Sequence, residues 1–548
     1  MSSRRSLWPR HLVWAVVLAP WSMLLPGARG QVAWHFTDAT AAAGLTSAHA
    51  YPPGPTTLGQ RAAGGVAAGD IDGDGDVDLY VVGGSAGRNR LFRNRGDGTF
   101  AEVGQAAGVA LDGVSGSGPL FFDYDGDGQL DLFVGAVDGG RLALFRNQGD
   151  GTFADVTASS GLALPDAALN TVSATAFDYD GDGWVDLFLA HWQSPAPTCH
   201  LWRNLAGDGF RCADHDAGLD ALAPDGIDLT FTGNFTDIDG DGAPDLLITA
   251  DFGHSSVWHN RGDATFARVT MPAISDENGM GSAVGDYDGD GDLDWFVSSV
   301  FDDDGVVEGD WGTTGNRLYR NRGGGDFEDR TSAAGVRDAD WGWAASFADY
   351  DHDGRLDLVV VNGWPQGSAQ FRDSPSRLFI ASASADGAGT FVERAAALGF
   401  DDRGDGRGVV SLDYDGDGDL DIFVANNNGP YRLFRNDGGR AAGHFLTVSL
   451  RGPAPNQFAI GALIRVTTGS RQQLRQVRAG SNYASQDPFD AHFGLGAAKR
   501  VDRLEVTWPG GAKTILEDVA IDETITVTSE TTSTGGAQLS SRSGCSGC

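Results

Sequence analysis

Short runs of consecutive apolar residues recur along the chain, and each follows a stretch rich in aspartate and glycine. Residues 132–134 (Leu-Phe-Val) and 187–189 (Leu-Phe-Leu) are two examples. Neither shows the alternation of apolar and polar residues that marks a strand with one solvated face. A short apolar run bounded by turn residues is typical of a strand buried on both faces. The pattern therefore predicts many short, fully covered strands.

A second motif follows these runs at a regular place. It reads Leu-Phe-Arg-Asn at residues 91–94, and close variants lie at 144–147, 201–204, 257–260, 318–321 and 433–436. Behind it, Gly-Asp-Gly-Thr-Phe at residues 96–100 and 149–153 predicts a hairpin turn into a further strand. The predicted unit is therefore strand, acidic loop, strand, crossover, strand, hairpin, strand.

The acidic stretch is a nine-residue loop that occurs seven times, with Asp at positions 1, 3, 5 and 9 and Gly at position 6. Four carboxylates in one tight loop repel one another by about 1 kcal/mol per close pair in water and more near a protein surface. A bound cation explains why such a loop is repeated, because the glycine at position 6 permits the turn that gathers oxygen ligands around Ca²⁺. Mg²⁺ fits less well, since it requires a near-ideal octahedron and retains its waters.

The predicted ligands are the four carboxylates of each loop and the backbone carbonyl at position 7, which gives up to seven Ca²⁺ sites. In chain order, loops 1 to 7 comprise Asp70, Asp72, Asp74, Asp76 and Asp78; Asp123, Asp125, Asp127, Gln129 and Asp131; Asp178, Asp180, Asp182, Trp184 and Asp186; Asp237, Asp239, Asp241, Ala243 and Asp245; Asp286, Asp288, Asp290, Asp292 and Asp294; Asp349, Asp351, Asp353, Arg355 and Asp357; Asp413, Asp415, Asp417, Asp419 and Asp421. Loop 6 also carries His352 and Arg355, whose added positive charge predicts weaker cation affinity.

Three other interpretations of the loop were weighed. An EF-hand requires a bidentate glutamate at position 12, but valine, leucine or isoleucine stands there in every copy. A calcium-binding β-roll requires a nonapeptide period, whereas the copies are 49 to 64 residues apart. Solvated Asp-Gly turns without a cation do not require aspartate at four fixed offsets. The sequence favours a cation loop in each repeat.

Four strands in each of seven units of about 50 residues predict an all-β fold, a seven-bladed β-propeller with a calcium loop in every blade. The segment 36–45 resembles residues 153–162, an outermost strand and its exit, yet no cation loop precedes it. We therefore expect the N-terminal strand to complete the blade of Asp413 and close the ring. The predicted propeller spans residues 31–443.

Residues 444–530 alternate between apolar and polar positions and predict a small β-sandwich-like domain. The tail 531–548, rich in Ser, Thr and Gly, is predicted to be disordered. Cys199 and Cys212 flank a predicted hairpin and are expected to form a disulfide. Cys545 and Cys548 form a C-x-x-C pair in the tail, where a small disulfide or an attachment signal is open.

Residues 1–30 are predicted to be a signal peptide, with three arginines before an apolar run from 12 to 25 and small residues at 28–30. The apolar run is shorter than the roughly 20 residues needed to span a bilayer, so we expect no membrane span in the mature chain. Arg4-Arg5 leaves general secretion and twin-arginine export both open. We therefore expect a secreted, extracellular or periplasmic protein, a setting in which weak calcium loops can be filled and disulfides persist.

The charge balance excludes nucleic acid as a partner. The chain has 39 basic and 75 acidic residues, a net charge of −36, and phosphate binding requires a basic face. Lysine occurs only at Lys499 and Lys513, so no lysine base is available in the repeats.

These motifs carry a resemblance to a known family. The loops with their following strands resemble FG-GAP (VCBS-type) repeats, as in integrin α-subunit propellers. The last segment resembles an ASPIC/UnbV domain, through residues 456–462, 478–481, 485–486, 492–496 and 506–511. Together they resemble the cartilage acidic protein family and its bacterial relatives over about residues 34–528. The resemblance implies an exported calcium-binding propeller with a small β-domain.

Loops on the ring face opposite the cation loops are the candidate ligand sites. They and the linkers between blades carry His191, Trp192, Phe252, His254, Phe301–Asp304, Trp311, Trp341, Trp343, Trp364, Asp401, Asp402, Asn426–Asn428 and Tyr431. Aromatic rings among amide and carboxylate groups suit sugar binding. Aromatic residues wedged between blades are the alternative for Trp343 and Trp364.

Three functions compete. The sequence favours an extracellular binding or adhesion module for a glycan or protein, in which calcium is mainly structural. A carbohydrate-active enzyme, such as a polysaccharide lyase, is the second, although no paired acid and base lie outside the metal loops. A purely structural matrix protein is the third.

Overall fold

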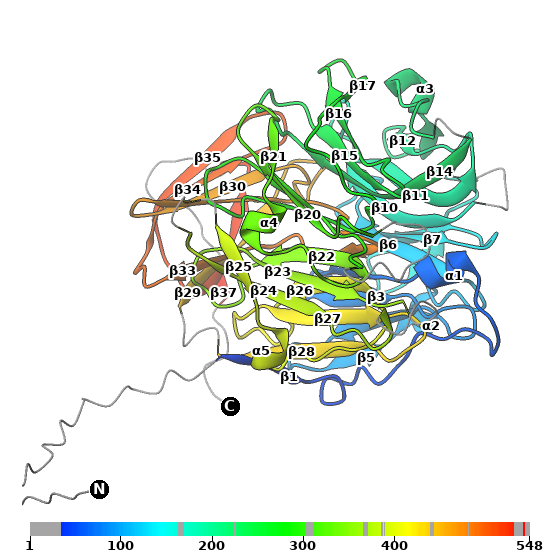
Figure 1. Cartoon of the computed structure of the whole chain (residues 1–548), viewed down its shortest axis with the longest axis horizontal. Coiled ribbons are helices and arrows are strands. Elements are labelled where there is room, and N and C mark those ends of the chain that lie inside the picture. Colours follow the sequence, from blue (N-terminus) through cyan, green and yellow to red (C-terminus); the bar gives the residue numbers. More distant parts are fainter. Residues whose placement is uncertain are drawn as a thin grey trace, which may run out of the picture. The chain divides into compact units, whose positions relative to one another are not determined.

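The computed structural model describes residues 34–162, 169–223, 226–302, 312–364, 371–384, 387, 389–438, 443–480, 482–530 and 541–542 (Figure 1). The predicted signal peptide, Trp311, Cys545 and Cys548 lie outside the described residues.

The 28 strands described before residue 438 form seven groups of four antiparallel strands, and we call each group a blade. The innermost strands are β2 (Val66–Gly69), β6 (Gly116–Phe122), β10 (Thr171–Phe177), β14 (Ile227–Thr236), β18 (Ser282–Gly285), β22 (Gly342–Ala348) and β26 (Gly406–Leu412). The second strands are β3 (Asp78–Val81), β7 (Asp131–Ala136), β11 (Asp186–Pro195), β15 (Asp245–Ala250), β19 (Asp294–Val297), β23 (Asp357–Asn362) and β27 (Asp421–Asn426).

The outer half of each blade is a hairpin. The third strands are β4 (Arg90–Asn94), β8 (Ala143–Asn147), β12 (Leu201–Asn204), β16 (Ser256–Asn260), β20 (Arg317–Asn321), β24 (Arg377–Ser382) and β28 (Arg432–Asp437). The outermost strands are β5 (Phe100–Glu102), β9 (Phe153–Asp155), β13 (Phe210–Cys212), β17 (Phe266–Val269), β21 (Phe327–Asp329), β25 (Thr390–Glu393) and, in the last blade, β1 (His35–Asp38).

The innermost strands contact one another in chain order, and β26 contacts β2, so they form a closed ring. The expected closure by the N-terminal strand is confirmed, because β1 pairs antiparallel with β28 from His35↔Asp437 to Asp38↔Phe434. The all-β class and the propeller arrangement predicted from the repeats are confirmed as well. Among the described residues, no helix is long and apolar enough to cross a membrane.

Burial follows the position of a strand within its blade. Every residue of the innermost strand β6 and of the second strand β7 is buried, as the continuous apolar runs predict. In the outermost strand β9 only Phe153 is buried. Blades 3 and 4 are also joined to each other, because β11 and β14 extend beyond the other strands of their kind and pair with one another.

The helices are short. α1 (Leu58–Ala62) begins with a capping box in which Thr57 and Gln60 satisfy each other's backbone N–H groups. The helices α2 (Gly104–Ala107), α3 (Asp214–Ala217), α4 (Thr331–Ala334) and α5 (Ala395–Leu398) each follow an outermost strand and end at a glycine with positive φ.

The C-terminal region forms two four-stranded sheets around a core of its own, which Figure 1 colours orange to red. One sheet orders β33 (Ala491–Gly496), β29 (His444–Arg451), β36 (Glu523–Thr528) and β37 (Ser541–Arg542); the other orders β31 (Arg471–Gln476), β30 (Leu463–Thr468), β34 (Val501–Thr507) and β35 (Lys513–Val519).

Residues 479–480 and 482–487 of this C-terminal region enter the ring of innermost strands, and we call them the plug. Its short strand β32 (Ser485–Gln486) pairs in parallel with β2. Gln486 Oε1 accepts a hydrogen bond from Phe121 N at 2.6 Å, and its Nε2 donates to Phe121 O at 2.9 Å. Tyr483 is fully buried, and its hydroxyl donates to Ala62 O at 2.6 Å. The C-terminal region therefore fills the axis of the ring.

Removal of β1 tests ring closure. A chain that begins at residue 50 loses the β1–β28 pairing and the buried ring of Phe36, so its free energy of unfolding should fall by at least the ~3 kcal/mol typical of removing a buried phenylalanine. Urea denaturation of this chain and of one that begins at residue 34 measures the difference. Equal denaturation midpoints would refute a stabilising role for the N-terminal strand.

Candidate metal sites in the seven acidic loops

Each acidic loop connects an innermost strand to the second strand of the same blade. The aspartate at position 1 follows the last residue of the innermost strand, and the aspartate at position 9 begins the second strand. In blade 2, Phe122 pairs with Asp131, so both ends of the loop are fixed by the sheet. The structure thus places the predicted residues of every loop together, and cation binding stays a prediction.

The carboxylate at position 1 organises the turn. In loop 1, Asp70 Oδ1 accepts a hydrogen bond from Gly73 N at 2.8 Å, and Oδ2 accepts one from Gly75 N at 2.9 Å. Both glycines have positive φ, 74° and 92°, which side chains other than glycine rarely adopt. Loop 6 keeps the turn with His352 at φ 56° in place of the first glycine.

The carboxylate at position 9 joins three segments of its blade. Asp131 is fully buried; its Oδ2 accepts from Tyr124 N at 3.1 Å, and its Oδ1 accepts from Asn147 N at 2.8 Å. The same pair of bonds recurs in all seven loops, with Ala381 N as the donor in blade 6.

The third strand supplies a cation that the sequence analysis missed. In loop 2, Arg146 lies 2.6 Å from Asp125 Oδ2 and 3.2 Å from Asp127 Oδ2, at positions 3 and 5. Arg93, Arg203 and Arg320 make the same two ion pairs in loops 1, 3 and 5. The arginine of the Leu-Phe-Arg-Asn motif was the signal, because it recurs at a fixed distance from each loop.

The asparagine of the same motif links neighbouring loops. Asn147 Nδ2 donates to Leu130 O of its own loop at 3.1 Å and to Ile71 O of loop 1 at 2.9 Å. Equivalent links to the preceding loop, at 2.8 to 3.0 Å, come from Asn94, Asn204, Asn260, Asn321 and Asn436. Asn94 of blade 1 reaches Tyr414 of loop 7, so the chain of links passes through the point of ring closure. Blade 6 has Ala381 at this position.

The ligand atoms converge as cation binding requires. Asp70, Asp72 and Asp78 of loop 1 each offer an oxygen, and these three atoms lie within 4.8 Å of one another. Loop 3 has the corresponding group at positions 1, 3 and 9, and in loop 2 the three converging carboxylates are those at positions 1, 3 and 5. Two position-3 oxygens, Asp125 Oδ1 and Asp415 Oδ1, are buried and have no hydrogen-bond partner. Burial of an unpaired carboxylate oxygen is costly, so these atoms fit a cation ligand.

Burial and mutual repulsion raise the carboxyl pKa values in the loops. Burial raises the pKa of Asp131 to about 9 and that of Asp78 to about 8, although both accept two backbone N–H bonds that act in the opposite direction. For Asp123 at position 1, burial and the neighbouring carboxylates Asp127 and Asp125 raise the pKa to about 7. Without a bound cation, the ionised carboxylates of these loops therefore have too little positive charge near them.

Most loops also face the C-terminal region. Gln457 Nε2 donates to Gly126 O in loop 2 at 3.2 Å, and His492 Nε2 lies 3.1 Å from Gly418 O in loop 7. Arg471 donates to the carbonyl of Asp353 in loop 6. Loop 4 differs, because a Cβ built on Gly240 or Gly242 would meet no atom within 4 Å.

Most aromatic candidates on the opposite face are core residues. Trp192, Trp343, Trp364 and Tyr431 are buried, as is His191. Trp341 and Trp364 stack with ring centroids 4.7 Å apart, so the structure gives them a packing role. Among the described aromatic candidates, Phe301 and Trp341 are half-buried and Phe252 is exposed, with 57% of its surface accessible and φ at 53°.

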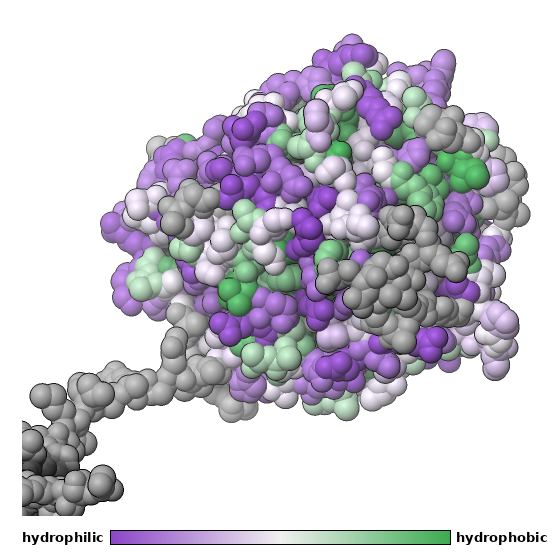
Figure 2. All heavy atoms as spheres, in the orientation of Figure 1, coloured by the Kyte–Doolittle hydropathy of each residue, from purple (hydrophilic) through white to green (hydrophobic). Residues whose placement is uncertain are grey.

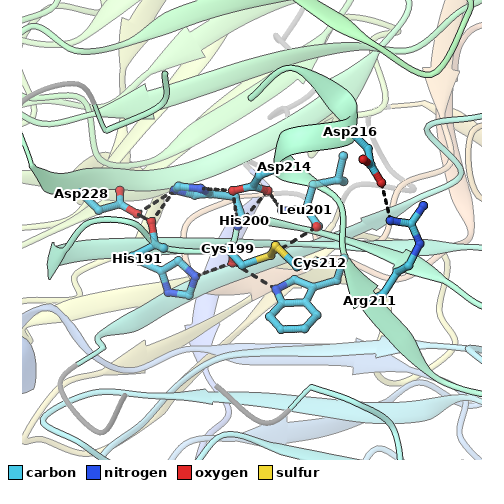
Figure 3. The surroundings of a disulfide bond; sticks show 11 residues. His191, Cys199, His200, Leu201, Arg211, Cys212, Asp214, Asp216 and Asp228 are labelled. Carbon is cyan, nitrogen blue, oxygen red and sulfur yellow. Dashed lines mark hydrogen bonds and ion pairs between the residues drawn. A yellow bond between two sulfur atoms is a disulfide. The ribbon is translucent and has the colours of Figure 1, made fainter. Parts of the chain in front are cut away.

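The predicted disulfide between Cys199 and Cys212 is confirmed, and a buried charge cluster lies beside it (Figure 3). His200 Nδ1 lies 3.1 Å from Asp214 Oδ2, and His200 Nε2 lies 2.6 Å from Asp228 Oδ2. Burial alone would lower the pKa of His200, but the two carboxylates outweigh it and raise the pKa to about 10. Both ring nitrogens therefore donate, and the imidazolium holds the hairpin to β14.

Comparison with known proteins follows the same division of the chain. The FG-GAP-like repeat family matches residues 70–134, 123–189, 237–297 and 301–360, and the ASPIC and UnbV family matches residues 452–534. Cartilage acidic protein 1 of Mus musculus is 27% identical over 479 residues, which are 73% of this chain and 71% of that protein. The Homo sapiens protein is 27% identical over 517 residues, 86% of this chain and 72% of its own. The expected resemblance is confirmed.

Substitution of Asn147 tests the links between loops. Asn147→Ala leaves the buried carbonyl oxygens of Ile71 and Leu130 without their donor, which should lower the free energy of unfolding by about 1–3 kcal/mol. Chemical denaturation measures the change, and Arg268→Ala, at an exposed position on β17, is the control. An Asn147 variant no less stable than this control would contradict the linking role.

His200→Gln tests the buried imidazolium. The pKa of His200 is higher in the folded state, about 10, than its ordinary value of 6.5, so its stabilising contribution is complete below pH 6.5 and is lost as pH rises toward 10. The stability difference between the wild type and His200→Gln should therefore be a few kcal/mol at pH 6 and shrink by pH 9.5. The control is His215→Gln, because His215 is an exposed histidine paired with Asp220. A difference that does not vary with pH would refute a charged His200.

Proposed function

We propose that this chain, which carries FG-GAP-like repeats and an ASPIC and UnbV domain, is an exported propeller that binds up to seven Ca²⁺ ions and acts as an extracellular binding module. The observation that carries the proposal is the convergence of three carboxylates in each of loops 1, 2 and 3, with oxygens of Asp125 and Asp415 that have no hydrogen-bond partner. Oxygen-only ligand sets at this density suit Ca²⁺, which takes six to eight oxygens in flexible geometry.

The third-strand arginines are compatible with a bound cation. In loop 2, Arg146 contacts the Oδ2 atoms of Asp125 and Asp127, and Asp125 Oδ1 is left for the metal. With its four carboxylates ionised and one guanidinium, loop 2 has a charge of −3. A divalent cation reduces that charge to −1, and the arginine limits the remaining repulsion.

The proposed role of Ca²⁺ is structural. Each loop connects an innermost strand to the second strand, and asparagine side chains connect neighbouring loops. A cation bound in a loop would therefore stabilise the ring and would have no catalytic role. Outside the loops, the described cluster of His200, Asp214 and Asp228 has the groups of an acid–base site, but its imidazole is buried and paired on both sides. This favours a binder over a polysaccharide lyase-like enzyme, which is the second candidate; a purely structural matrix protein is the third.

The ligand would be a glycan or a protein, bound on the face opposite the cation loops. Phe252 supports this placement. Its backbone is strained at positive φ, and its exposed ring makes too few packing contacts to offset that strain. The face of the molecule shown in Figure 2 is mainly hydrophilic, with separate hydrophobic areas. An aromatic ring beside polar groups can stack on the C–H face of a sugar.

Chelation tests the calcium sites. Removal of Ca²⁺ from the mature protein with EGTA should lower Tm, and re-addition of Ca²⁺ should restore it, because a cation bound only by the folded state stabilises that state. Scanning calorimetry gives Tm, and metal analysis by mass spectrometry gives the number of ions bound. Mg²⁺ in place of Ca²⁺ is the control. An unchanged Tm together with no bound calcium would sink the proposal.

Phe252→Ala tests the ligand face. The variant should keep the Tm of the wild type, because the ring is exposed, and should lose binding to any glycan that the wild type captures on an array. Val392→Ala, at another exposed apolar side chain, is the matched control. Turnover of acidic polysaccharides by the wild type would instead favour the enzyme. Array binding unaffected by Phe252→Ala would move the site elsewhere.

A further inference from the structure

Loop 4 has a donor set that differs from those of its relatives in the ring. In blade 4 the third strand reads Ser-Val-Trp-His-Asn, so His259 occupies the position of Arg93, Arg146, Arg203 and Arg320 in blades 1, 2, 3 and 5. An arginine at this position can only donate hydrogen bonds, whereas an imidazole nitrogen can either donate to these carboxylates or coordinate a metal in place of its proton. This one replacement brings a potential nitrogen ligand to the site.

The imidazole points at two carboxylates of its loop. His259 Nδ1 lies 3.0 Å from Asp245 Oδ1 and 3.3 Å from Asp239 Oδ2, and the three residues can place their ligand atoms within 4.8 Å of one another. A tetrahedral first-row divalent ion about 2.0–2.2 Å from each donor holds neighbouring donors roughly 3.4 Å apart. The 3.3 Å separation of His259 Nδ1 and Asp239 Oδ2 is close to this spacing, and the 3.0 Å contact of His259 Nδ1 with Asp245 Oδ1 is a hydrogen bond that the ion would replace.

We propose that loop 4 is a transition-metal site, formed by Asp239, Asp245 and His259, that prefers a first-row divalent cation such as Zn²⁺ to Ca²⁺. Imidazole nitrogen raises affinity for these ions, whereas Ca²⁺ takes oxygen ligands. The inference refines the proposed calcium function at one of its seven loops, and the other six keep oxygen ligands and stay with Ca²⁺.

The site is accessible to a metal from solvent. The Cβ positions of Gly240 and Gly242 face open space, whereas an equivalent atom at Gly126 would meet Pro455 and one at Gly418 would meet Phe445. The His259 side chain is about one-third exposed, and that of Asp245 is buried. The loop therefore combines a buried anionic base with an open side, and the ion keeps room for water or a ligand group.

His259→Arg is the decisive variant, because it installs the arrangement that four other blades already contain. Untagged wild type and His259→Arg would be stripped of metal, reloaded with excess Ca²⁺, exposed to Zn²⁺ and passed through a desalting column. Elemental analysis should find one more equivalent of zinc in the wild type than in His259→Arg, and one more equivalent of calcium in His259→Arg than in the wild type. His215→Gln controls for zinc bound by an exposed histidine and aspartate elsewhere.

Two further readouts keep the outcome clear. Asp239→Asn, which retains His259, should also lose the zinc, and Tm of both variants in Ca²⁺ shows whether they fold. Equal zinc in wild type and His259→Arg, or zinc fully displaced by Ca²⁺, would overturn the inference. His259 would then only donate hydrogen bonds to the carboxylates, as the arginines of the other blades do. Zinc retained by a wild type that binds no calcium would support the inference while refuting the proposed calcium function.

Discussion

The buried aspartate at position 9 is the constraint on which each blade depends. It begins the second strand, and its two oxygens bind the backbone of the loop and of the third strand, so one carboxylate fixes three segments. Burial of a charge in this way is costly unless opposite charge is near. The turn at position 6, the carboxylates at positions 1, 3 and 5 and the third-strand arginine are all arranged around that requirement.

Contacts at three places in the structure close the ring. At the rim, β1 completes the last blade. At the level of the loops, Asn94 connects blade 1 to Tyr414 of loop 7. On the axis, the plug binds strands from both ends of the ring, through Val66 and Ala67 of blade 1 and through Val409 of blade 7. No covalent bond joins β28 to blade 1, so these noncovalent contacts determine whether the first and last blades stay together. The C-terminal domain is accordingly part of the ring's stability as well as a domain with its own core.

The sequence was sufficient to predict the features that recur in every blade. Aspartates at fixed offsets and continuous apolar runs predicted the loops, the covered strands and the N-terminal closure, because each depends on local spacing. It was insufficient where partners are far apart in the chain. The motif at 478–486 gave no sign that Gln486 would bind Phe121, 365 residues away. The arginine and asparagine of the third strand were visible as a motif, but their targets lie across a crossover or in another blade. Trp343 and Trp364 could be read as a ligand platform until their burial was known.

Comparison of the loops shows that compensation of charge is preserved while its source changes. In four blades a third-strand arginine pairs with the carboxylates at positions 3 and 5, and blade 7 has Arg435 at this position, where it pairs with Asp437. Blade 4 has His259 there, which contacts Asp239 and Asp245. Blade 6 has Ile380 at that position, and there Arg355 of the loop itself pairs with Asp353 while Arg471 of the C-terminal domain binds the Asp353 carbonyl. Loop 6 also lacks the asparagine link, since Ala381 replaces it. The domain that plugs the axis thus supplies a cation to the blade that lost its own, which couples the electrostatics of the ring to the docking of its C-terminal domain.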